Sequence, residues 1–157
     1  MLLAYRLVRL IETHSEQLAD GLLERLQSDP KCYPYGGVPS EEFRQAAIEI
    51  YQRLGDWLLG KGEEEVGRRY REIGHRRAQQ GVSLPQLIWA IALTKENLIE
   101  FLQRQTSESK PVEILGELEV VNALERFFDH AMYYSALGHE QGLSAGAAAS
   151  AGGAPPS

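Results

Sequence analysis

Apolar side chains recur at steps of three and four residues through most of the chain, and this spacing constrains the fold more than any other feature. Residues at these steps share one face of an α-helix, whereas a half-buried strand shows strict alternation. The sequence contains no alternating stretch enriched in β-branched residues. The pattern therefore predicts an all-α fold of about five helices, near residues 3–27, 40–60, 63–80, 84–103 and 109–141.

These helices predict a single compact bundle with four-helix-bundle or globin-like packing, because each has an apolar face that another helix must cover. A length of 157 residues corresponds to one domain. The sharpest boundary signal is a capping box, in which Ser83 is the N-cap, Pro85 lies in the first turn and Gln86 follows three residues after the cap. Gly81 suits the left-handed conformation that closes the preceding helix.

The composition changes at Gly142. From there to Ser157 the chain consists of Gly, Ala, Ser and Pro with a single leucine and no charged residue. Such a composition is typical of a flexible linker. We therefore expect one helical domain over residues 1–141 and a flexible, disordered Gly/Ala/Pro-rich tail over residues 142–157.

The net charge of −6 argues against a nucleic-acid partner, because phosphate backbones repel an acidic surface. Residues 63–103 have helix-turn-helix spacing, but apart from Gln86 the positions that would read bases are unsuited to it. No apolar run is long enough to span a membrane. The single cysteine, Cys32, agrees with a reducing cytoplasm.

Glu72 and His75 share a helix face, with the three-residue spacing found in di-iron carboxylate proteins. A complete site needs a second Glu-x-x-His pair and two further carboxylates, and the second pair is missing from the sequence. Glu72 and His75 are therefore the candidates for a metal-binding helical-bundle enzyme. The alternative is a surface glutamate beside a weakly restrained histidine.

His14 and His130 are the candidates for binding a cofactor. His14 lies on the apolar stripe between Ile11 and Leu18, and His130 lies in the aromatic-rich last helix. Either histidine could be an axial ligand in a small-molecule or haem sensor with globin-like packing. The alternative is a partly buried histidine with a structural role, and we expect no cofactor.

The sequence shows no assembled catalytic constellation. Cys32 lies in a loop rich in Pro, Gly and Tyr, with no histidine close to it in sequence. Nucleophile-elbow, phosphate-loop and dinucleotide-binding motifs are also missing. We therefore predict that the protein is not an enzyme.

The segment 70–90, YREIGHRRAQQGVSLPQLIWA, resembles the central pattern of the RsbT co-antagonist RsbRD-type N-terminal domain. In that pattern a helix ends in glycine, arginines, alanine and a polar residue before a second glycine. A small aliphatic residue, Ser or Pro, Leu and an amphipathic helix then follow. The resemblance covers most of residues 7–140, and its specific part is residues 74–90.

The resemblance implies a non-catalytic sensory or regulatory input domain of bacterial stress-response signalling that acts through protein–protein contacts. Such domains precede an output module, which this chain lacks, so the domain either acts alone or is a fragment. We expect a cytoplasmic homodimer with a protein partner in the pathway. The expected partner surface consists of paired aromatic residues in the last helix, namely Phe127, Phe128, Tyr133 and Tyr134.

Overall fold

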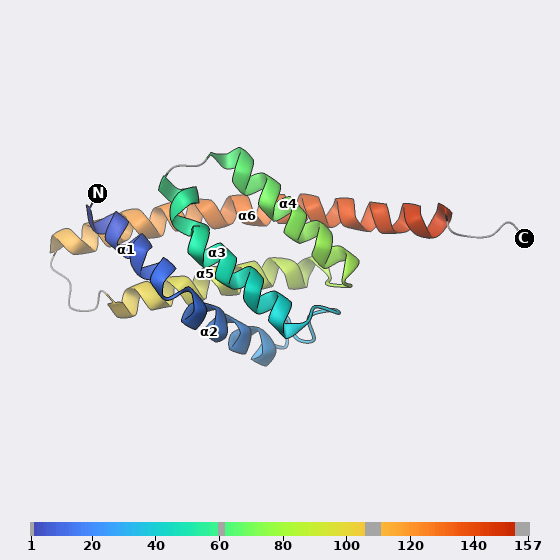
Figure 1. Ribbon diagram of the computed structural model, residues 1–157, viewed down its shortest axis with the longest axis horizontal. Coiled ribbons are helices and arrows are strands. Elements are labelled where there is room, and N and C mark those ends of the chain that lie inside the picture. Colours follow the sequence, from blue (N-terminus) through green and yellow to red (C-terminus); the bar gives the residue numbers. More distant parts are fainter. Residues whose placement is uncertain (1, 60–61, 106–110, 153–157) are drawn as a thin grey trace, which may run out of the picture.

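The computed structural model describes residues 2–59, 62–105 and 111–152, and within these ranges it contains six α-helices and no strand. The helices are α1 (Leu2–Thr13), α2 (Ser15–Ser28), α3 (Ser40–Leu59), α4 (Glu63–Gln79), α5 (Leu84–Gln105) and α6 (Pro111–Gly152) (Figure 1). The predicted all-α class is confirmed, but the described part holds six helices where the sequence predicted about five.

The additional helix arises because the predicted helix over residues 3–27 is divided at His14. The Thr13 hydroxyl donates to the carbonyl of Arg9 at 2.7 Å, and the His14 ring lies 2.9 Å from the carbonyl of Leu10. Side chains that bond to the preceding turn are a known cause of helix bending. Apolar periodicity continues across the break, since Ile11 and Leu18 are both buried, so the pattern alone predicts one helix.

Helix α6 is the longest helix, and it runs beside the other elements along most of the molecule in Figure 1. It contacts α1, α3, α4 and α5, whereas α2 packs on α3 and α5. The amphipathic face of each shorter helix is thereby covered by its neighbours. The core lies where these faces meet.

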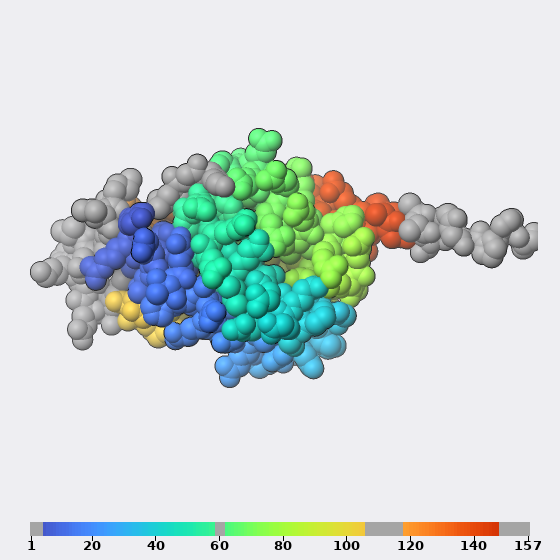
Figure 2. Space-filling view, in the orientation of Figure 1, coloured from blue at the N-terminus to red at the C-terminus, as the bar shows by residue number. Residues whose placement is uncertain are grey.

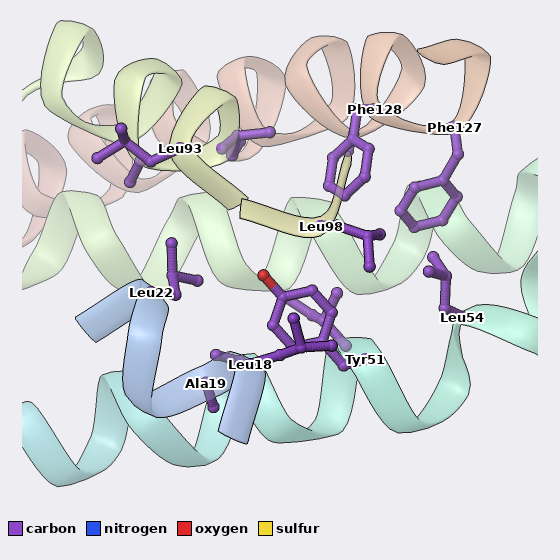
Figure 3. Close-up of a cluster of buried hydrophobic side chains, with 14 of the residues drawn as sticks. Leu18, Ala19, Leu22, Tyr51, Leu54, Leu93, Leu98, Phe127 and Phe128 are labelled. Carbon is purple, nitrogen blue, oxygen red and sulfur yellow. The ribbon is translucent and has the colours of Figure 1, made fainter. Parts of the chain in front are cut away.

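The core consists of aliphatic and aromatic side chains from α1 to α6 and from the loop between α2 and α3. Figure 3 shows its centre, with Tyr51 of α3 between leucines of α2 and phenylalanines of α6. Trp57, Tyr70 and Phe127 form an aromatic group in which the Trp57 and Phe127 rings stack with centroids 5.6 Å apart. Such ring pairs contribute about 0.5–1.5 kcal/mol beyond the burial of their area.

Helices α4 and α6 approach each other so closely that their backbones touch. A Cβ atom at Gly74 of α4 would overlap the carbonyl of Ser135, and a Cβ atom at Gly138 of α6 would overlap the carbonyl of Arg71. At Gly142 a Cβ atom would lie 2.7 Å from the carbonyl oxygen of His75. Side chains cannot occupy these positions at this helix separation, so glycine sets the distance between α4 and α6.

Residues 142–152 continue α6, which differs from the expected flexible tail beginning at Gly142. Gly142 is buried against α4, and the alanines that follow have the highest helix propensity of any residue. Glycine at this position therefore serves close helix packing rather than flexibility. The remaining part of the expected tail, residues 153–157, lies outside the described residues.

The glycine contacts predict opposite effects for two Gly-to-Ala substitutions in α6. Gly138→Ala should lower the free energy of unfolding by about 2–3 kcal/mol, because the new methyl group meets the α4 backbone. Gly146→Ala should raise it by up to about 1 kcal/mol, since no described atom lies within 4 Å of its Cβ position and alanine favours helix. Urea denaturation measures both changes, and equal effects would contradict close backbone packing.

Candidate functional site

The four aromatic residues expected to form a partner surface are not equivalent in the structure. Phe127 and Phe128 are buried in the core, so the prediction that they face a partner is wrong. Tyr133 is 60% exposed, and Tyr134 is half-buried. The Tyr134 hydroxyl donates to Glu63 at 2.7 Å, which leaves Tyr133 as the accessible member of the group.

The metal-ligand candidates are not brought into a common donor set. Glu72 is exposed and lies 3.6 Å from the guanidinium of Arg69, and His75 is half-buried on α4. Among the described residues, no three His, Cys, Asp or Glu side chains converge on one point. Glu72 therefore belongs to the mixed-charge surface of α4 in this structure.

The cofactor candidates occupy separate environments. The His14 ring packs on Phe101 with centroids 5.4 Å apart, and its Nδ1 atom lies against the Leu10 carbonyl. His130 is exposed, 3.7 Å from Glu63. Neither histidine lines the cavity of about 40 Å³ at the centre of the domain, and that cavity is far too small for a porphyrin.

Cys32 is a buried structural residue. Its Sγ atom donates to the carbonyl of Gln86 at 3.6 Å. Burial raises the pKa of the Cys32 thiol to about 11, and the negative charge of Asp29 adds to this effect. Because the thiolate is the nucleophilic form, these surroundings suppress its reactivity.

The turn between α4 and α5, residues 80–83, is held by segments that are distant in sequence. Gly81 adopts a φ of +82°, which confirms its predicted left-handed conformation. The backbone N–H of Gly37 donates to the Gln80 carbonyl at 2.7 Å, and the His139 ring of α6 contacts the Val82 carbonyl at 2.6 Å. The α4–α5 turn is therefore held in place by contacts with both the α2–α3 loop and α6.

The predicted capping box is confirmed, and it has a second role. The backbone N–H of Gln86 donates to the Ser83 hydroxyl at 3.3 Å, and the backbone N–H of Ser83 donates to the Gln86 side chain at 3.1 Å. The Gln86 amide also donates to the carbonyls of Cys32 and Pro34 at 3.0 and 2.7 Å. The Gln86 side chain therefore connects the start of α5 to the α2–α3 loop.

Glu42 of α3 connects that helix to the end of α4. Its carboxylate accepts hydrogen bonds from Arg76 at 2.6 Å, from Gln80 at 2.6 Å and from Arg77 at 2.7 Å. Arg77 is only 5% exposed, so Glu42 neutralises a nearly buried cation. The hydrogen bond from Arg76, followed by that from Gln80, lowers the pKa of Glu42 to about 2.

His139 is a buried residue that the sequence analysis did not single out. A carbonyl can only accept, so its Nε2 atom carries the proton and donates to Val82. The His139 Nδ1 atom and the neighbouring Ser135 hydroxyl have no hydrogen-bond partner among the described residues. The sequence signal that could have identified His139 is the pair of polar residues at positions 135 and 139, which lie four residues apart on a largely apolar helix.

A cavity of about 40 Å³ lies at the centre of the domain, lined by α2 to α6 and by the α2–α3 loop. Its wall is mostly apolar. Tyr70 lines it, and the buried Tyr70 hydroxyl has no partner among the described groups. No sequence signal marks this cavity, because its lining residues come from segments far apart in the chain.

Within the described helices, none combines the length and the apolar character needed to cross a membrane.

The low pKa of Glu42 predicts a pH-dependent contribution to stability. The ionised form is favoured by folding, so its contribution is full above the reference pKa of 4.5 and is lost as pH falls towards about 2. Glu42→Gln should cost about 2 kcal/mol at neutral pH, and this cost should shrink between pH 4.5 and pH 2. Denaturation at several pH values measures the stability lost in Glu42→Gln, and Glu24→Gln, at an exposed position, is the control for the change in net charge. A cost that does not vary with pH would contradict the assignment.

The two buried polar residues of α6 predict effects of opposite sign. Ser135→Ala should raise the free energy of unfolding by about 0.5–2 kcal/mol, because it removes a buried hydroxyl without a partner among the described residues. His139→Ala should lower it by about 2–4 kcal/mol, because it leaves a cavity and removes the donor to Val82. Thermal and urea denaturation measure both changes in the free energy of unfolding. A His139→Ala variant as stable as wild type would show that the contact of His139 with Val82 contributes little to stability.

No curated protein and no solved structure matches the chain. The family model described as the RsbT co-antagonist protein rsbRD N-terminal domain matches residues 16–151. That match spans most of the chain, including α2 to α6 almost completely. The chain therefore belongs to the RsbRD N-terminal domain family, a family of regulatory input domains.

Proposed function

We propose that the domain is a non-catalytic input domain of a cytoplasmic bacterial signalling protein, and that it acts through protein–protein contacts. The observation that carries this proposal is the family match over residues 16–151. Two of the side chains considered from the sequence have structural partners: Cys32 is buried, and Glu72 lies in a surface ion pair with Arg69. Regulation through helix packing needs no reacting group.

Helix α6 is the element best suited to transmit a change in the domain. It contacts four other helices, and its backbone touches that of α4 at Gly74 and Gly138. Its far end projects past the other helices in Figure 1, and the part coloured red projects past them in Figure 2. A stimulus that shifts α6 against α4 and α5 would move this end, provided that the stimulus binds two packed states with different affinity.

We further propose that each copy is a bundle of globin-like or four-helix type, and that two copies associate through the outer face of α6. Residues on this face are exposed at heptad spacing: Arg126, Asp129, Tyr133, Glu140 and Leu143. Arg126 and Glu140 lie seven residues on either side of Tyr133. An antiparallel pair centred on Tyr133 would place Arg126 opposite Glu140 of the partner subunit, whereas a parallel pair would place like charges together.

Charge reversal tests this arrangement. Arg126→Glu and Glu140→Arg should each weaken the dimer about tenfold, because each places like charges across the interface. The double variant Arg126→Glu/Glu140→Arg should restore association, since the two charges are exchanged. Light scattering coupled to size exclusion, over a range of concentrations, measures the dissociation constant.

The control is Glu24→Arg on the exposed surface of α2, a helix that packs on α3 and α5, and it should not change association. A wild-type chain that stays monomeric at high concentration would contradict the homodimer. A double variant as weak as the single variants would contradict the antiparallel pairing.

A further inference from the structure

The central cavity lies at the meeting point of the elements that the proposed signalling function would move. Its lining includes Leu22 of α2, Ile50 of α3, Leu87 of α5 and Phe128 of α6. Its volume of about 40 Å³ exceeds the roughly 10–15 Å³ that a single water requires, so it has room for an occupant of a few heavy atoms. Together with Tyr70 of α4, these lining residues come from five helices.

The polar groups of this region identify Tyr70 as the one available to an occupant. The Thr94 hydroxyl, which also lines the cavity, donates to the Ala90 carbonyl at 2.8 Å, and the Tyr35 hydroxyl is hydrogen-bonded to Arg77. The fully buried Tyr70 hydroxyl has no such partner within the described part of the chain. Burial raises the pKa of Tyr70 well above its ordinary value, which keeps the O–H proton in place for donation.

The charge balance of the cavity wall indicates a neutral occupant. Arg77 is the charged residue among the described side chains that line the cavity, and Glu42 already pairs with it at 2.7 Å. An anionic occupant would have to compete with Glu42, and a cationic one would find no counter-ion among the lining residues described. Desolvating an unpaired charge is far more costly than desolvating a neutral polar group.

The cavity adjoins an open groove on the surface. Ala46, Ile73 and Arg77 line both the cavity and the open charged groove between α3 and α4. The wall between the two spaces is therefore formed by these three side chains. Movement of Arg77 would open the wall and would also disturb the Glu42 contact that connects α3 to the α4–α5 turn.

We propose that the central cavity is a binding site for a small neutral organic molecule of three or four heavy atoms that carries one hydrogen-bond acceptor, which accepts from the Tyr70 hydroxyl. Short-chain ketones and alcohols are the chemical class that fits. This inference rests on the proposed input function, for which it supplies the stimulus. Binding of the ligand and association of two copies are measured separately, so one can fail without the other.

Acetone and isobutene form a matched pair of probes, because they have the same shape and differ in that acetone carries the acceptor. The full chain, labelled at its isoleucine and leucine methyl groups, is titrated with each probe and followed by NMR. A ligand of four heavy atoms binds no more tightly than roughly 40 µM, so the titration extends into the millimolar range. Acetone should shift the methyl signals of Ile50, Ile73, Ile91 and Leu87, which line the cavity.

Variants separate a site at Tyr70 from nonspecific binding. Tyr70→Phe should weaken the binding of acetone about fivefold to tenfold and leave the affinity for isobutene unchanged, since it removes only the hydrogen-bond donor. Tyr134→Phe, at the contact between α6 and α4 and outside the cavity lining, is the matched control and should change neither affinity. Ala90→Val should abolish binding of both probes by filling the cavity, and its methyl spectrum shows whether the variant is folded.

Three results would overturn the inference. The first is that acetone does not shift the NMR signals of the methyl groups that line the cavity of the wild-type chain, which would mean that the cavity holds only water. The second is equal acetone affinity in wild type and Tyr70→Phe. The third is tighter binding of isobutene than of acetone, which would show a dry apolar cavity in which the Tyr70 hydroxyl is not used.

Discussion

The close approach of α4 and α6 is the constraint on which the rest of the structure depends. At Gly74 and Gly138 each helix presents bare backbone to the other, and a Cβ atom at either position would overlap a main-chain carbonyl. Because the helices are this close, the His139 ring reaches the Val82 carbonyl in the turn that follows α4. The position of α6 is thereby coupled to the conformation of the α4–α5 turn.

The family pattern in residues 74–90 has a physical explanation in the contacts that these residues make. Gly74 allows the contact with α6, Arg77 pairs with Glu42, and Gly81 takes a positive φ. Gln86 caps α5 and holds the α2–α3 loop. Each of these residues maintains the junction between α3, α4, α5 and α6, so the pattern describes contacts that hold these helices together.

The contacts that hold the end of α4 against α3 involve a residue that also lines the central cavity. This shared residue connects helix packing to the proposed ligand. Arg77 lines the cavity while its guanidinium bonds to Glu42 and Gln80, at the end of α4. Phe128 contributes to the same wall from α6. A change inside the cavity therefore acts directly on the two helices whose backbones touch. Close-packed interiors transmit such changes because they do not deform continuously.

The sequence by itself determined the helical class, the capping box at Ser83 and the left-handed Gly81, because helix periodicity and capping depend on residues within four positions of each other. Tertiary structure alone decided the burial of Phe127 and Phe128 and the packing of Gly142 against α4. It also decided the contact of His139 with Val82, the central cavity and the exposure of Tyr133. These features depend on contacts between residues that are distant along the chain, and local sequence patterns carry no information about which distant surfaces meet.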